Sequence, residues 1–107
     1  MPADIIDELY RILEERKTAD PRQSYVAGLY ADGVDHILKK IGEEATELVI
    51  SGKAGSQDQI IRETADLWFH SLVLLAYKGI SSDRVMSELE RRFGQSGLEE
   101  KASRQQQ

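Results

Sequence analysis

The stretch that decides the fold is GVDHILKKIGEEATELVIS, residues 33–51. Its apolar residues recur with helical spacing, because Ile41 and Leu48 fall within about 40° of Ile37 at roughly 100° per residue. Glu44 falls about 20° from Ile37 on the other side, in the middle of this apolar stripe. The sequence therefore predicts a helix that buries a carboxylate, which is costly unless the carboxylate is paired, protonated or bound to a cation.

The next stretch, SQDQIIRETADLWFHSLVLLAYKG at residues 56–79, predicts a second long helix. Ser56 and Gln59 have the spacing of a capping box, and Gly79 suits the C-terminal end. The helix is apolar on most sides, which is typical of a central helix. A line of polar side chains nevertheless follows one face: Glu63, Asp66, His70 and Tyr77. We expect Trp68 and Phe69 to lie in the core.

The rest of the chain predicts three further helices and no strand. They span about residues 4–17, about 21–31, with Asp20 as N-cap and Gln23 closing a capping box, and about 81–93. The fold class expected is all-α, a bundle of about five helices in one domain at residues 1–94. Residues 95–107 form a polar tail that we expect to be mobile or ordered only by a partner.

The amino-acid composition excludes several classes of protein. The chain has 107 residues, no cysteine and a net charge of −5. The absence of cysteine excludes disulfide scaffolds and thiolate metal sites and fits a reducing cytoplasm. A general nucleic-acid binder would carry an excess of bases, so no nucleic-acid partner is expected. There is no apolar run near the roughly 20 residues of a membrane helix, and the acidic N-terminus does not resemble a signal peptide.

Two pairs of acids lie three residues apart, Glu44 with Glu47 and Glu63 with Asp66. Each pair shares one helical face, and antiparallel packing across the loop at residues 52–56 would bring the pairs together. Four carboxylates and water make an all-oxygen site, which favours Mg²⁺ or Mn²⁺ over zinc. A single pair of this kind more often marks a solvated helix face. Two pairs on adjacent apolar helices favour metal binding.

The motif E-E-x-x-E at residues 43–47, followed by E-x-x-D at 63–66, resembles the signature of the all-α (MazG-like) nucleoside triphosphate pyrophosphohydrolases. Within this superfamily the chain is most similar to the phosphoribosyl-ATP pyrophosphatases of histidine biosynthesis. The matching stretches are residues 24–26, 37–47, 63–70, 85–93 and 96–104. The acid motif is shared by the whole superfamily and indicates only a pyrophosphohydrolase. The K-K-x-G-E-E run and the upstream Ser-Tyr make the resemblance specific to enzymes that act on phosphoribosyl-ATP.

The resemblance implies metal-assisted hydrolysis of 1-(5-phosphoribosyl)-ATP between the α and β phosphates, with release of pyrophosphate. It implies that the metal ligands are Glu44, Glu47, Glu63 and Asp66. Glu43 becomes the candidate to orient or deprotonate the attacking water, or else an outer acid.

Four residues are candidates for substrate binding. Lys40 precedes the acids and is expected to bind a phosphate, with a salt bridge to Glu44 or Glu43 as the alternative. Lys39 is a weaker candidate. Ser24 and Tyr25 are candidates by resemblance, with a core position as the alternative for Tyr25. A core position is also the interpretation favoured for His70.

Two other functions stay open at this stage. One is a house-cleaning pyrophosphohydrolase acting on another nucleotide, and the other is a non-catalytic helical dimerisation module whose acids only form salt bridges. For each of these functions, the helix at residues 56–79 has apolar side chains on more faces than the other helices of one small chain can bury. We therefore expect a homodimer or a dimer of dimers.

Overall fold

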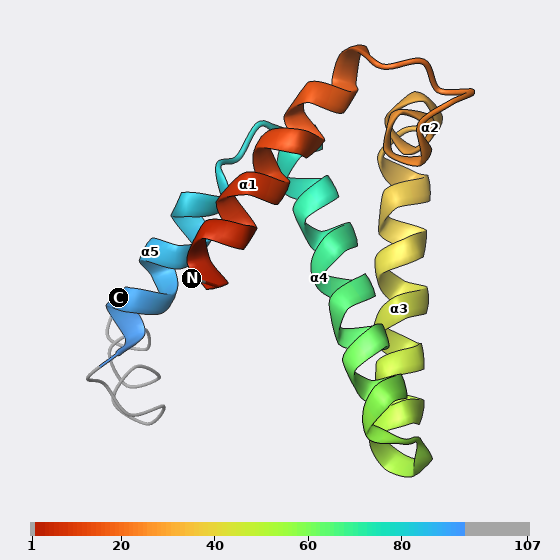
Figure 1. The fold of residues 1–107 in the computed structure, drawn as a ribbon, viewed down its shortest axis with the longest axis vertical. Coiled ribbons are helices and arrows are strands. Elements are labelled where there is room, and N and C mark those ends of the chain that lie inside the picture. The colour runs from red at the N-terminus through yellow and green to blue at the C-terminus, as the bar shows by residue number, and fades with distance from the viewer. Residues whose placement is uncertain (1, 94–107) are drawn as a thin grey trace, which may run out of the picture.

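The structure, a computed structural model, describes residues 2–93, and within them it contains five α-helices, one 3₁₀ segment and no strand (Figure 1). The expected all-α fold is thereby confirmed. The predicted tail at residues 95–107 lies outside the described residues. The elements are α1 (Pro2–Glu15), η1 (Arg16–Thr18), α2 (Tyr25–Asp32), α3 (Val34–Ala54), α4 (Gln57–Lys78) and α5 (Ser82–Arg92).

Helices α3 and α4 form a long antiparallel hairpin, which is the most extensive helix–helix contact of the fold (Figure 1). The predicted capping box is present: Ser56 Oγ accepts from the Gln59 amide at 3.2 Å, and the Gln59 side chain accepts from the Ser56 amide at 2.8 Å. The expected end of α3 at Ser51 is wrong, because the helix passes through Gly52 and ends at Ala54. The glycine that the turn requires is Gly55, where a Cβ atom would lie 2.8 Å from the Ser51 carbonyl oxygen.

Helix α2 begins later than the sequence predicts. Its N-cap is Ser24, whose hydroxyl accepts from the Ala27 amide at 3.2 Å, and its first residue is Tyr25. Asp20 caps no α-helix; its carboxylate instead accepts from the Arg22 amide at 2.9 Å and from the Arg22 guanidinium at 3.1 Å. This local bond closes a separate turn before α2, because an aspartate that bonds two residues ahead competes with helix formation.

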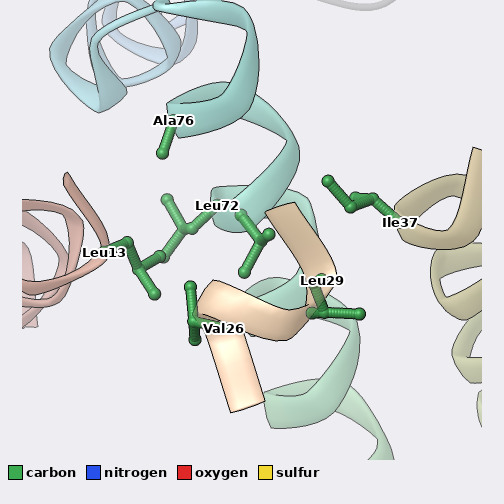
Figure 2. Packing of buried hydrophobic residues seen from close by; sticks show 7 residues of the cluster. Leu13, Val26, Leu29, Ile37, Leu72 and Ala76 are labelled. Carbon is green, nitrogen blue, oxygen red and sulfur yellow. The ribbon is translucent and has the colours of Figure 1, made fainter. Parts of the chain in front are cut away.

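The buried core lies where α1, α2, α3 and α4 meet, at one end of the hairpin (Figure 2). Its members are Leu13, Val26, Leu29, Ile37, Leu72, Val73 and Ala76. Two tyrosines join α1 to the other elements here, since Tyr30 donates to the Leu13 carbonyl at 2.9 Å and Tyr10 donates to the Ile80 carbonyl at 2.7 Å. Gly79 ends α4 with a φ of 70°, as its place in the sequence predicts.

The rest of the hairpin carries large apolar side chains that no described helix covers. Trp68 is 60% exposed and Ile61 is 64% exposed on α4, and Val49 is 72% exposed on α3. The expectation that Trp68 lies in the core is therefore wrong for the single chain. The Cα radius of gyration is 16.2 Å, whereas a compact chain of about 100 residues has a value near 13 Å. Among residues 2–93, no helix is both long and apolar enough to span a bilayer.

Candidate metal and phosphate site

Three carboxylates from the two long helices meet beside the core. Glu44 of α3 and Glu63 and Asp66 of α4 each place one oxygen within 4.8 Å of the other two. The helical period puts Glu44 on the face of α3 that packs against α4, where it is only 7% exposed. Glu63 is half-buried and Asp66 is exposed, so the cluster opens from the helix interface toward solvent. The convergence expected from the sequence is present for these three acids.

Glu63 is the most unusual member of this acid cluster. Its Oε2 atom is buried and accepts no hydrogen bond from the described residues. The pKa of Glu63 is raised, first by the neighbouring Glu47 carboxyl, which can share a hydrogen bond with it only if one of the two is protonated, then by burial and by the charges of Asp66 and Glu44. A buried carboxylate oxygen without a donor, surrounded by other acids, is the environment that a cation relieves.

Glu47 is exposed and stands beside Glu63 but outside the group of three close oxygens. Thus the structure brings together three of the four predicted ligands and leaves the fourth at the rim. The donors are all carboxylate oxygens, and such a set fits Mg²⁺ or Mn²⁺ and does not favour zinc. The acid cluster is therefore suited to hold a divalent metal.

Ion pairing does not account for the acids. Among residues 2–93, the only ion pair of the cluster joins Lys40 Nζ to Glu44 Oε1 at 3.7 Å, while Glu63 and Asp66 have none. The salt bridge considered as the alternative for Lys40 is thus present, although it is long, and phosphate binding by Lys40 stays a prediction. The pKa of Lys40 is raised, first by the charge that Tyr25 gains on ionisation and then by Glu43 and Glu44. Lys40 therefore keeps its positive charge at the edge of the acid cluster.

Lys39 and Glu43 lie on the outer side of α3. Both are exposed, and with Gly42, Thr46 and Glu47 they line an open depression of about 550 Å³. Glu47 connects this depression to the acid cluster, because it lines the depression and also neighbours Glu63. Glu43 thus has free access to water, as a residue that handles an attacking water requires.

Ser24 and Tyr25 stand at the start of α2, and Tyr25 is close enough to Lys40 for the two side chains to interact electrostatically. The Ser24 hydroxyl caps the helix, a role that the sequence analysis did not assign to it. Tyr25 is 57% exposed, so the core position considered for it is wrong. Burial of its hydroxyl raises the pKa of Tyr25, and Lys40, Glu44, Asp66 and Glu43 all act on it electrostatically. The phenol therefore borders the acid cluster.

His70 was expected to be a core residue, and it is buried at 6% exposure. Sequence reasoning missed its partners. Its Nδ1 atom lies 2.8 Å from the Asp66 carbonyl oxygen, and its Nε2 atom lies 2.8 Å from the Tyr25 hydroxyl. The four-residue spacing from Asp66 gives a signal for the first bond, but Tyr25 is 45 residues away and nothing local predicts it.

The family model described as phosphoribosyl-ATP pyrophosphohydrolase matches residues 6–93. The chain belongs to this family. The match spans the acid cluster as well as Ser24, Tyr25, Lys39 and Lys40. All the candidate site residues therefore lie within the part of the chain that matches the phosphoribosyl-ATP pyrophosphohydrolase family.

Similar proteins cover the chain almost completely. A protein of Methylococcus capsulatus named phosphoribosyl-ATP pyrophosphatase is 61% identical over 101 residues, which are 94% of this chain and 96% of the relative. Proteins with the same name from Geotalea daltonii and Trichlorobacter lovleyi are 57% and 58% identical. They match 97% and 95% of this chain and 98% and 94% of their own lengths. The likeness to this phosphoribosyl-ATP pyrophosphohydrolase family therefore extends well beyond the acid motif.

Proposed function

We propose that the chain hydrolyses 1-(5-phosphoribosyl)-ATP to 1-(5-phosphoribosyl)-AMP and pyrophosphate, a step of histidine biosynthesis. The family and the names of the relatives support the substrate. The observation that carries the chemistry is the buried, unpartnered Glu63 oxygen within a cluster of acids. Such a cluster would repel a triphosphate unless a divalent metal neutralised both.

Glu44, Glu63 and Asp66, joined by Glu47 at the rim, would hold the Mg²⁺ or Mn²⁺. Bound there, the metal would neutralise charge on the phosphate oxygens and polarise the bond to be broken. The carboxylates of these four residues are carried by two rigid helices, which keeps the site in place without a loop movement. The buried position of Glu44 strengthens its interaction with a cation, because water screens it little.

The remaining candidates surround this centre. Lys40 carries a positive charge that can move from Glu44 to a phosphate oxygen, since its 3.7 Å contact is a weak one. Glu43 would orient the attacking water and accept its proton. Lys39, Ser24 and Tyr25 would contact the parts of the substrate that extend along α3 and toward α2. We also place the reaction in the cytoplasm, as the cysteine-free sequence predicts.

Phosphorus NMR of the reaction tests this function. With phosphoribosyl-ATP and Mg²⁺, we expect pyrophosphate as the first product, with no orthophosphate formed before it. A panel of ordinary and modified nucleoside triphosphates serves as the control for substrate choice. Release of orthophosphate as the primary product would contradict pyrophosphohydrolase chemistry. Faster turnover of another nucleotide would instead assign the chain a house-cleaning role.

A homodimer is the second part of the proposal. Ile61 and Trp68 lie seven residues apart, on one face of α4, and both are more than half exposed. Val49 and Ile50 add a further exposed apolar surface on α3. Pairing the hairpin with its copy in a second chain would complete a four-helix core about a two-fold axis. Such an interface is large and apolar, as in obligate dimers.

Sedimentation equilibrium at low micromolar concentration tests the dimer. We expect twice the chain mass of 12.1 kDa for the wild type. Introducing charges with Ile61→Asp and Trp68→Asp should shift the mass toward that of one chain, because each carboxylate would have to be desolvated in the interface. Ile5→Asp, on the equally exposed Ile5 of α1, is the matched control. A fully active 12.1 kDa wild-type monomer would show that the hairpin face needs no partner.

A further inference from the structure

A hydrogen bond between His70 and Tyr25 joins α4 to α2, and the geometry around His70 determines which of the two side chains is the donor. The Asp66 carbonyl oxygen lies 2.8 Å from His70 Nδ1, and a carbonyl oxygen can only accept. Nδ1 therefore carries the proton. In the neutral ring the other nitrogen, Nε2, is then a bare acceptor, and the Tyr25 hydroxyl at 2.8 Å must donate to it.

The imidazole itself is firmly held. Its exposure is 6%, and Phe69 contacts it edge-on, with ring centres 5.3 Å apart and planes at 80°. The Tyr25 ring meets the imidazole in the same T-shaped manner, at 5.9 Å and 88°. A buried, immobile acceptor on the central helix thus receives the hydroxyl of a side chain that is itself mostly exposed.

Tyr25 needs such an anchor because of where it stands. It is the first residue of α2, directly after the Ser24 cap. On one side its hydroxyl is influenced by Lys40 and the acid cluster, and on the other its ring lines a depression of about 390 Å³ together with Pro21, Arg22, Leu29 and His36, among others. Without the bond to His70, an exposed tyrosine at a helix start would sample several rotamers.

We propose that His70 is a positioning residue that holds Tyr25 as the wall between the acid cluster and this depression. The inference rests on the proposed function, in which the triphosphate lies at the acids. The nucleoside part of the substrate, with its second phosphorylated ribose, then extends past Tyr25 into the depression. His70 itself touches no substrate; it acts through the phenol, which presents a fixed ring face to that part of the nucleotide.

Steady-state kinetics of single and double variants test the role. Tyr25→Phe keeps the ring and removes the donor, and His70→Leu removes the acceptor. We expect each to raise KM by roughly five- to tenfold, the effect of one hydrogen bond, while kcat changes far less. Because both variants break the same bond, the double variant should be no worse than either single one. His70→Gln, whose amide oxygen can accept from Tyr25, should restore most of the affinity.

Nitrogen NMR of the imidazoles gives a readout that does not depend on activity. The chain has two histidines, so His36 serves as an internal control. We expect His70 to be the Nδ1–H tautomer, with an Nε2 resonance that shifts in Tyr25→Phe while the His36 resonances stay unchanged. An Nε2–H tautomer, or a wild-type KM in Tyr25→Phe, would overturn the inference. If phosphoribosyl-ATP is not turned over at all, the proposed function fails, whereas the tautomer measurement still decides the link.

Discussion

Replacing any one of Glu44, Glu47, Glu63 or Asp66 by its amide is expected to lower turnover by roughly a thousandfold or more. The amide keeps the shape of the side chain but removes the negative charge that would hold the metal. Three of these acids converge within 4.8 Å, and the fourth, Glu47, adjoins Glu63. Initial rates of pyrophosphate release with phosphoribosyl-ATP and saturating Mg²⁺ measure the loss.

The controls separate loss of chemistry from loss of fold. Asp35→Asn changes an exposed acid in the first turn of α3, away from the cluster, and should leave the rate near that of the wild type. Circular dichroism should show the same helix content in all variants, because the acid cluster contributes little to the core at Leu13, Leu29 and Val73. Wild-type rates in the Glu44→Gln or Glu63→Gln variant would reject the acids as metal ligands.

Removal of divalent metal is the second prediction with a large effect. In excess chelator, turnover should fall to background, and the thermal midpoint should fall as well. Ligand that binds only the folded state stabilises it in proportion to the logarithm of its excess over Kd, by about 2.7 kcal/mol at a hundredfold excess. Differential scanning fluorimetry with and without Mg²⁺ measures the shift. Glu63→Gln should lose most of the response to Mg²⁺, and full activity in chelator would contradict the metal site.

The metal-free protein should also become less stable as the pH rises. The pKa of Glu63 is raised in the folded state by Glu47, burial and the other acids, so the folded chain binds this proton more tightly than the unfolded chain does. Protonated Glu63 therefore stabilises the folded state fully below the pKa of about 4.3 that the residue has in the unfolded chain. This stabilisation is lost as the pH rises through the pKa of Glu63 in the folded chain. Added Mg²⁺ should reverse the trend, because it binds the deprotonated acids.

Glu88 also makes the stability depend on pH, but it titrates in a lower pH range that this experiment can avoid. Hydrogen bonds from Arg91 and Arg92 lower the pKa of Glu88 to about 2. This stabilisation is present above the unfolded pKa of about 4.3 and is lost only as the pH falls toward 2. Glu88 therefore stays ionised throughout thermal scans in chelator between about pH 5 and 7.5, and its titration does not contribute to them. A smaller loss of stability with pH in Glu63→Gln than in the wild type is the expected difference.

Features that depend on local periodicity could be derived from the amino-acid sequence. The two long helices, the capping box at Ser56 and the C-terminal glycine Gly79 all follow from interactions within a few residues. The burial of Glu44 follows from its position within the stripe of Ile37 and Ile41, because a helix presents every third or fourth residue to the same neighbour. The helical period is thus enough to place each acid pair on one face of its helix, whereas the meeting of the two faces also depends on antiparallel packing of α3 against α4.

The start of α2 and the contacts between distant segments became known only from the structure. The start of α2 moved to Tyr25 because Asp20 bonds to Arg22 in a local turn, a competition that helix signals alone do not resolve. Trp68 is exposed because no helix within residues 2–93 packs on that face of α4. The apolar pattern of α4 predicts that this face is buried, but it does not identify the segment that buries it. The bond between Tyr25 and His70 joins residues 45 positions apart. Its existence depends on how α2 docks against α4, and that docking is set by the shapes of the packed core side chains, which the helical period of either segment does not encode.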